Sequence, residues 1–145
     1  MRRVTVRGII IKDGKLFAQR LNKRDGGVKD YWCTPGGGLD DGESLHDGLA
    51  REMIEETGVK PVIGRLLFVQ QYADEKREYL EFFFEITNAN DYEQIDLQAT
   101  THGAAEVAEF GFIDVTKERI LPKSLQVINL SLPLEEKVQI ANYLA

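Results

Sequence analysis

The sequence has one cysteine, no long hydrophobic run and no excess of basic residues, and each shortage excludes a class of protein. Cys33 alone cannot form an internal disulfide or a cysteine-rich zinc site, which fits a reducing compartment. The apolar run from Gly8 to Ile11 is too short for a signal-peptide core or a membrane span, so we expect a soluble, cytoplasmic protein without a membrane partner. A net charge of −6 disfavours broad attraction to nucleic acid, and we expect no nucleic-acid partner.

The apolar content is enough for a single core. The chain has 145 residues, of which 43% are hydrophobic, and this predicts one domain over residues 1–145. Runs rich in strand-forming residues alternate with turn signals, and the strongest signal is Asp13-Gly14, which predicts a hairpin between its flanking runs. The predicted strands are residues 4–11 and 15–20, then a second hairpin of 62–72 and 78–87, then 107–115. The sheet is therefore expected to be mixed or largely antiparallel.

Two helices are expected. The first covers residues 44–57, because Ser44 is suited to the N-cap, Asp47 completes a capping-box pattern and Gly58 is placed to end the helix. The second covers about 133–144, because it begins with Pro133 and its apolar residues have amphipathic spacing.

Three glutamates, Glu52, Glu55 and Glu56, fall in one stripe of the first helix, roughly 100° wide. Like charges at this spacing repel by about 0.2–0.5 kcal/mol per pair. A hard divalent cation such as Mg²⁺ would offset the repulsion, whereas a solvated acidic face is the commoner explanation of such spacing alone. Gly48 lies inside the stripe, and because it has no side chain we expect that a ligand could approach the helix there.

A wider pattern surrounds this stripe. Gly37 is followed after five residues by Glu43 and after seven more by the run Arg51 to Val59, "REMIEETGV". This pattern resembles the signature of the Nudix hydrolase family, Gly-x5-Glu-x7-Arg-Glu-U-x-Glu-Glu-x-Gly-U, where U is a bulky aliphatic residue. All seven fixed residues are present between residues 37 and 59, and Met53 in the first aliphatic position is one small departure.

The resemblance implies a fold, a reaction and a set of site residues. The fold would be α/β, an α/β/α sandwich with a central mixed sheet and the box as loop–helix–loop. The reaction would be hydrolysis of a pyrophosphate linkage in a nucleoside diphosphate derivative with Mg²⁺, for which Mn²⁺ can substitute. By position, Glu52, Glu55 and Glu56 would be the side-chain metal ligands and the carbonyl of Gly36 a backbone ligand. Arg51 and Glu43 would orient the helix carboxylates.

The general base is left open, because family members use either a box glutamate or one on a distant loop. Glu106 and Glu109 are the loop candidates and Glu55 or Glu56 the box alternatives, although Glu106 and Glu109 are equally suited to be ordinary surface acids. For the substrate, cations and aromatic rings are the groups that bind phosphates and bases. The candidates are Arg20, Lys23, Arg24 and Tyr31, with Trp32, Tyr72 and Tyr79 as further rings, although Trp32 and the run Phe82–Phe84 are better suited to the core.

The expected substrate is a small nucleotide, either a nucleoside triphosphate, oxidised or not, or a nucleotide sugar such as ADP-ribose. The alternative is a non-catalytic Nudix module that senses a nucleotide; such modules often lose box glutamates, and here none is lost. Decapping of RNA is disfavoured by the acidic charge. The resemblance also allows a homodimer, since many family members form one.

Overall fold

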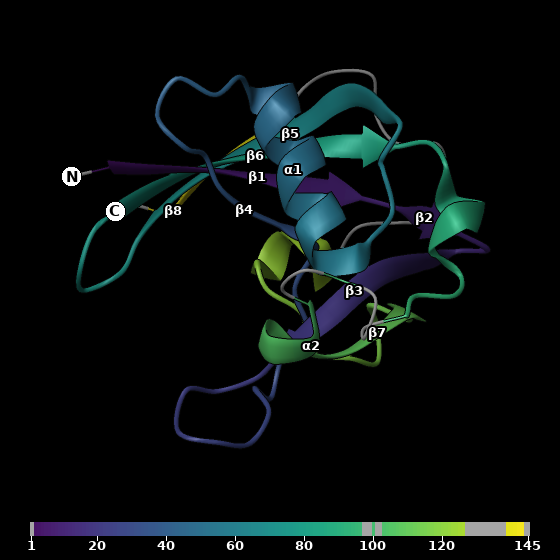
Figure 1. The fold of residues 1–145 in the computed structure, drawn as a ribbon. Helices are drawn as coiled ribbons and strands as arrows, with labels where there is room; N and C mark the ends of the chain where they lie inside the picture. Colours follow the sequence, from purple (N-terminus) through teal and green to yellow (C-terminus); the bar gives the residue numbers. More distant parts are fainter. Residues whose placement is uncertain (1, 97–99, 101–102, 127–138, 144–145) are drawn as a thin grey trace.

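The computed structural model describes residues 2–96, 100, 103–126 and 139–143. Its strands form a five-stranded sheet in the order β4-β1-β6-β5-β8 and a three-stranded sheet in the order β2-β3-β7 (Figure 1). The strands are β1 Arg2–Ile9, β2 Ile11–Lys12, β3 Lys15–Leu21, β4 Gly36–Gly38, β5 Ile63–Ala73, β6 Glu78–Ile86, β7 Val107–Ile113 and β8 Gln139–Tyr143. The helices are α1 Leu45–Thr57, α2 Gly103–Glu106 and the 3₁₀ turns η1 Ala89–Tyr92 and η3 Lys123–Gln126. None of these described helices is long and apolar enough to cross a membrane.

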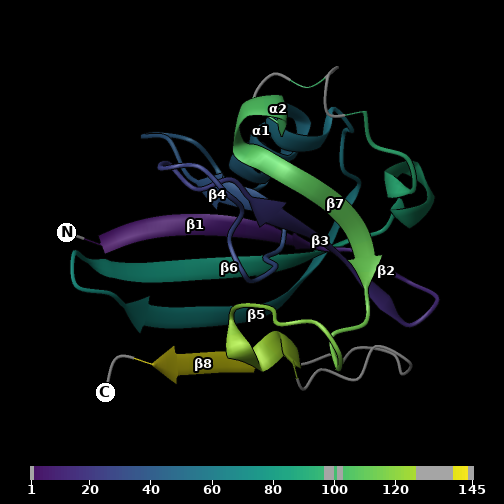
Figure 2. The ribbon, with the colours of Figure 1, turned by 90° about the horizontal axis from the view of Figure 1, so that it is seen from below.

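The five-stranded sheet is mixed, as predicted. Strand β1 runs parallel to β6 and antiparallel to β4, and β5 runs antiparallel to β6. Figure 2 shows β1, β6, β5 and β8 lying side by side in that order. The predicted hairpin of residues 62–72 and 78–87 is confirmed as β5 and β6, and the predicted strand 107–115 as β7. Together with α1, these elements confirm the α/β fold with a central mixed sheet and a loop–helix–loop box.

The first predicted hairpin is confirmed only at its turn. Asp13 and Gly14 both have positive φ, 51° and 73°, which matches the twist of a tight hairpin. The strands that it joins are the short β2 and β3, whereas β1 does not pair with β3. The predicted pairing of residues 4–11 with 15–20 is therefore wrong over β1, because both edges of β1 are taken by β4 and β6.

Helix α1 confirms the prediction for residues 44–57. The Ser44 hydroxyl accepts a hydrogen bond from the Asp47 N–H at 3.0 Å, and Gly58 ends the helix at φ 75° with its N–H bonded to the Ile54 carbonyl. Leu49 and Met53 are fully buried on its inner face. These two anchors pack α1 onto the sheet in a core whose buried members are Val6, Ile10, Phe17, Leu49, Met53, Phe84, Ile86 and Tyr92.

A second core lies on the other face of β1 and β6. It contains Phe83 and Ile9, together with residues of the smaller sheet and of the segment that follows it. The run Phe82–Phe84 alternates between the two cores, and Phe83 and Phe84 are buried, as expected for strand aromatics. Trp32 packs against this second core, also as expected.

The predicted terminal helix over 133–144 is wrong where the structure describes it. Residues 139–143 form β8, which runs parallel to β5 from Phe68 to Tyr72. Residues 133–138 and 144 lie outside the described residues. The free edge of β5 presents unpaired backbone N–H and C=O groups, and a strand that pairs with them outweighs the weak helix preference of a short segment.

Candidate active site

The loop that enters the box is a glycine strand held against β1. Strand β4 pairs antiparallel with β1, so that Gly36 lies opposite Arg7 and Gly38 opposite Thr5. Gly36 has φ 138°, and a Cβ on it would lie 2.0 Å from the Val6 carbonyl oxygen. A Cβ on Gly37 would lie 2.6 Å from the Glu52 carboxylate. Only glycines therefore allow the strand and the first box glutamate of α1 to approach each other this closely.

Gly48 has a different role from the predicted one. A Cβ on Gly48 would lie 2.2 Å from Leu39 and 3.0 Å from the Glu43 carboxylate. The space beside this glycine is thus filled by the preceding loop, and the expectation of a ligand approach there is wrong. The glycine instead allows Glu43 to lie close to α1.

Arg51 holds the loop and the helix together. Its Nε and Nη2 donate to the two oxygens of Glu43 at 2.7 and 2.9 Å, and Nη2 also donates to the Gly38 carbonyl at 3.1 Å. The bonds from Arg51, followed by one from the Asp40 N–H, lower the pKa of Glu43 to about 2. This bidentate pair has the orienting geometry that the resemblance implied for Arg51 and Glu43.

The same guanidinium also contacts two of the three box glutamates. Arg51 Nη1 lies 3.1 Å from Glu52 Oε1 and 3.3 Å from Glu55 Oε2. Both carboxylates are only partly exposed, at 19% and 26%. Burial raises the pKa of Glu52, and the bond from Arg51 opposes this. Glu52 and Glu55 therefore lie side by side around one positive charge.

Glu56 is the most deeply buried of the three, with 5% of its surface exposed. The Gly36 N–H donates to its Oε1 at 3.3 Å, whereas Oε2 is buried without a hydrogen-bond partner. Burial raises the pKa of Glu56 to about 7, against the opposing charge of Arg7. A buried carboxylate oxygen without a donor is unfavourable unless a cation reaches it.

These residues are of the types that bind a divalent cation, but their side chains do not lie close enough together to hold one in this arrangement. In the part of the chain that the structure describes, no three His, Cys, Asp or Glu side chains are close enough together to hold a metal ion. Arg51 occupies the position between Glu52 and Glu55, and the Gly36 carbonyl accepts a bond from Arg7 Nη1 at 3.3 Å. Partly exposed ion pairs contribute only about 0–1 kcal/mol, so a metal ion can replace Arg51 at these oxygens. The orphaned Glu56 oxygen supports the fit.

A cavity of 480 Å³ lies in front of the box and brings half of the predicted site residues together. Its lining includes Gly36, Arg51, Glu52, Glu55, Glu56 and Glu106. Glu106, at the end of α2, thus lines the same cavity as the box glutamates, and its role as the general base stays a prediction. Glu109 does not line this cavity; its carboxylate binds Arg20 Nη1 at 3.1 Å across the β3–β7 pair.

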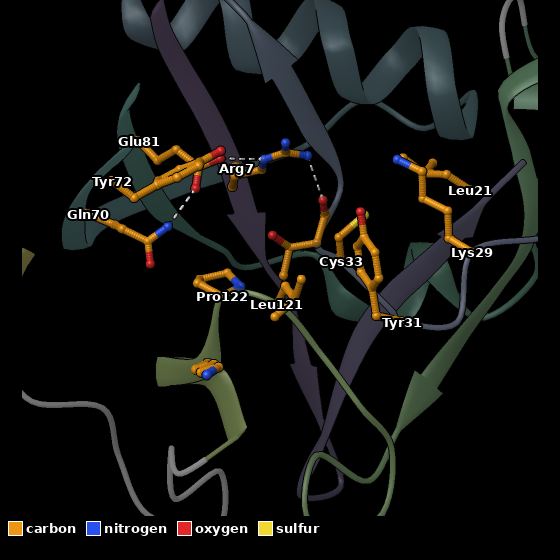
Figure 3. A pocket seen from close by; sticks show the side chains of 12 residues that line it. Arg7, Leu21, Lys29, Tyr31, Cys33, Gln70, Tyr72, Glu81, Leu121 and Pro122 are labelled. Atoms are coloured by element: carbon orange, nitrogen blue, oxygen red, sulfur yellow. Dashed lines mark hydrogen bonds and ion pairs between the residues drawn. The ribbon is translucent and has the colours of Figure 1, made fainter. Parts of the chain in front are cut away.

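A second cavity of 530 Å³ adjoins the first, because Arg7 and Leu21 line both (Figure 3). It contains Tyr31 and Tyr72, which agrees with the choice of Tyr31 as a candidate for base stacking. Arg20, Lys23 and Arg24 line neither cavity. Arg20 is bound to Glu109 and to the Lys29 carbonyl, and Lys23 and Arg24 lie in an exposed loop, so their role in substrate binding stays a prediction.

Sequence reasoning missed Arg3, Arg7 and Gln19, which all line the box cavity. Arg3 and Arg7 come from β1 and Gln19 from β3, elements whose patterns indicate only strands. One signal was available for Arg7, because it is the one charged residue in the run Val4–Ile11, which otherwise contains only Val, Thr, Gly and Ile. A charged residue inside a strand that is covered on both faces indicates a buried partner or a binding role.

Comparison with known proteins agrees with this site. The family model of the NUDIX domain matches residues 1–128. An RNA pyrophosphohydrolase of Caulobacter vibrioides is 30% identical over 125 residues, which cover 76% of this chain and 71% of that protein. An ADP-ribose pyrophosphatase of Methanocaldococcus jannaschii is 35% identical over 71 residues, 49% of this chain and 41% of that protein.

Among solved structures, a MutT protein from Methanosarcina mazei Go1 superposes with a TM-score of 0.62 at 25% sequence identity, covering 80% of this chain and 79% of that one. The family match includes the whole box, and the superposition includes most of the fold that presents it. The chain is therefore a Nudix pyrophosphohydrolase, a member of the NUDIX domain family.

Proposed function

We propose that the protein is a Mg²⁺-dependent hydrolase, with Mn²⁺ as a substitute, that cleaves the pyrophosphate linkage of a small nucleoside diphosphate derivative by attack of water at phosphorus. The observation that carries this proposal is the convergence of Glu52, Glu55, Glu56 and Glu106 on one cavity beside the Gly36 carbonyl. The metal, when bound, neutralises the charge of the phosphate oxygens and lowers the pKa of the attacking water.

The chain's own residues supply position and proton transfer. Glu43 and Gly38 fix the Arg51 guanidinium, which keeps the carboxylates of α1 facing the cavity. Glu106 takes the proton of the attacking water, so that the oxygen bonds to phosphorus while the other phosphoryl group leaves with the bridging oxygen. In the described part of the chain no ion pair or hydrogen bond occupies the Glu106 carboxylate, which suits it to accept a proton.

The second cavity supports a substrate with an organic group attached to the pyrophosphate. It joins the box cavity at Arg7 and Leu21 and presents two tyrosine rings, which suits a flat base. Both a nucleoside triphosphate and a nucleotide sugar such as ADP-ribose meet this requirement. The relatives named as RNA and ADP-ribose pyrophosphatases belong to the same range of chemistry.

The test is a hydrolysis screen over nucleoside triphosphates, their oxidised forms, nucleotide sugars and dinucleoside polyphosphates, with products identified. Replacing both Glu55→Gln and Glu56→Gln should abolish metal-dependent turnover of every substrate that the unaltered protein cleaves. Glu75→Gln, in the exposed β5–β6 turn, is the matched control and should retain full activity. Retained turnover in the double variant contradicts the proposal. Tight nucleotide binding by the unaltered protein without any turnover in Mg²⁺ indicates a sensing module instead.

A further inference from the structure

Arg7 is the charged residue that the two cavities share. It lies near the middle of β1, between β4 and β6, and its side chain keeps 22% of its surface exposed. Leu21, the other shared residue, is apolar. A substrate that extends from the box into the second cavity therefore has to pass the Arg7 guanidinium.

The guanidinium of Arg7 is fixed on two of its three nitrogens. Nε donates to Glu81 Oε2 at 3.1 Å, and Nη1 donates to the Thr34 carbonyl at 3.0 Å and to that of Gly36 at 3.3 Å. Glu81 is itself 4% exposed and accepts a bond from Gln70 Nε2 at 3.0 Å. The side chain is thus held in one orientation before any ligand arrives.

The third nitrogen, Nη2, has no hydrogen-bond partner among the described residues. In Figure 3 it carries no dashed line and points to the side on which α1 lies, away from Glu81. Arg7 lines the box cavity together with Glu52, Glu55 and Glu56 on that side. A fixed cation with free N–H groups beside a predicted metal site is suited to an anionic oxygen.

Strand pairing does not require this buried ion pair. The same two strands carry Arg2 and Glu78, whose exposed ion pair at 2.9 Å joins β1 to β6 near the end of the sheet. Taking an Arg–Glu pair out of water is often no more stabilising than apolar packing of similar volume. The position of the Arg7–Glu81 pair between the two cavities is better explained by a role of Arg7 in binding a ligand.

We propose that Arg7 binds a non-bridging oxygen of the substrate's pyrophosphate at the junction of the two cavities, with Glu81 and Gln70 as the residues that position it. The inference rests on the proposed function, because the ligand is the pyrophosphate that the box would cleave. Arg7 then determines which substrates fit: those whose phosphates reach from the box to the junction, with the organic group in the second cavity.

The test measures binding of methylenediphosphonate, a non-hydrolysable pyrophosphate, in Mg²⁺ by calorimetry. The main variant combines Arg7→Met with Glu81→Gln, so that no unpaired charge stays buried. Loss of a charged hydrogen bond should raise the Kd about tenfold to hundredfold. Arg2→Met, which breaks the exposed pair on the same strands, is the matched control and should bind within about twofold of the unaltered protein.

Two further measurements separate a ligand contact from a structural role. The affinity for Mn²⁺ alone should fall less than about threefold in every variant, because Arg7 donates no hydrogen bond to the box carboxylates and its loss only frees the Gly36 carbonyl, to which Nη1 donates. Arg7→Lys keeps the charge and should recover part of the lost diphosphonate affinity. Unchanged diphosphonate affinity in the double variant, a parallel fall in Mn²⁺ affinity, or a lysine variant no better than the double variant would overturn the inference. Failure of the proposed function is distinct, because the unaltered protein would then bind Mn²⁺ and diphosphonate and cleave no nucleotide.

Discussion

Glu106 and Glu109 are three residues apart, yet their surroundings differ. Glu106 ends α2 and faces the box cavity, whereas Glu109 lies on β7 opposite Arg20 and binds its guanidinium. A general base contributes about 10²–10⁴ in rate, so we predict that Glu106→Gln lowers kcat at least tenfold. Steady-state kinetics at saturating Mg²⁺ would check this.

Glu109→Gln is the matched comparison for this prediction. Its carboxylate is held by Arg20 and lines neither cavity, so its effect on kcat should be clearly smaller than that of Glu106→Gln. A larger loss in the Glu109 variant would reverse the assignment. If neither variant loses about tenfold in kcat, the loop base is excluded and Glu55 or Glu56 becomes the candidate.

At the scale of single residues, the sequence predicts what is local. The three box glutamates share a cavity because their spacing places them on one side of a helix. Helical periodicity alone determines which residues share a face, so this can be predicted from the sequence. Arg3, Arg7 and Gln19 reach the same cavity only because β1 pairs with β4 and β3 lies nearby. Such neighbours depend on strand pairing across long stretches of chain, which residue spacing does not encode.

At the scale of elements, strand β4 packs so closely against β1 that Gly36 leaves no room for a side chain. We predict that Gly36→Ala destabilises the protein by about 3 kcal/mol or more, because a Cβ would lie 2.0 Å from a backbone oxygen that cannot move aside. Gly42→Ala is the control: it also has positive φ, 79°, but no atom lies within 4 Å of its Cβ position. It should lose only the roughly 1–2 kcal/mol of left-handed strain. Urea unfolding would measure both, and equal losses would contradict this account.

The predicted elements succeeded or failed for a related reason. Helix α1 carries its own N-cap and C-cap, and the β5–β6 hairpin carries its own turn, so local signals define them. Strands β1 and β8 are defined by their neighbours instead: β1 is paired with β4 and β6, and β8 with the edge of β5. Local pattern placed β1 in the wrong pair and predicted a helix where β8 forms.

At the scale of the whole molecule, the net charge of −6 limits how the substrate is held. The cations that line the two cavities include Arg7, paired with Glu81, and Arg51, paired with Glu43. Arg3 lines the first cavity as well, and Lys29 and Lys123 line the second, so we expect phosphate recognition to depend on these cavity cations. This matters because relatives of the chain are named RNA pyrophosphohydrolases, and an RNA chain carries further phosphates along its backbone.

We predict that the protein does not use the backbone of an RNA chain. A 5′-triphosphorylated RNA of about ten nucleotides should be cleaved with a kcat/KM within about threefold of that for a nucleoside triphosphate, because a net charge of −6 disfavours broad attraction of its further phosphates. Raising the salt from about 50 to about 200 mM should lower both values less than about tenfold, against the 10³–10⁵ expected for six to ten phosphate contacts. Measuring both substrates at both salt concentrations would decide the question. A steep salt dependence for the RNA alone would show that the protein binds the RNA backbone. That result would contradict the prediction and would make RNA the substrate class.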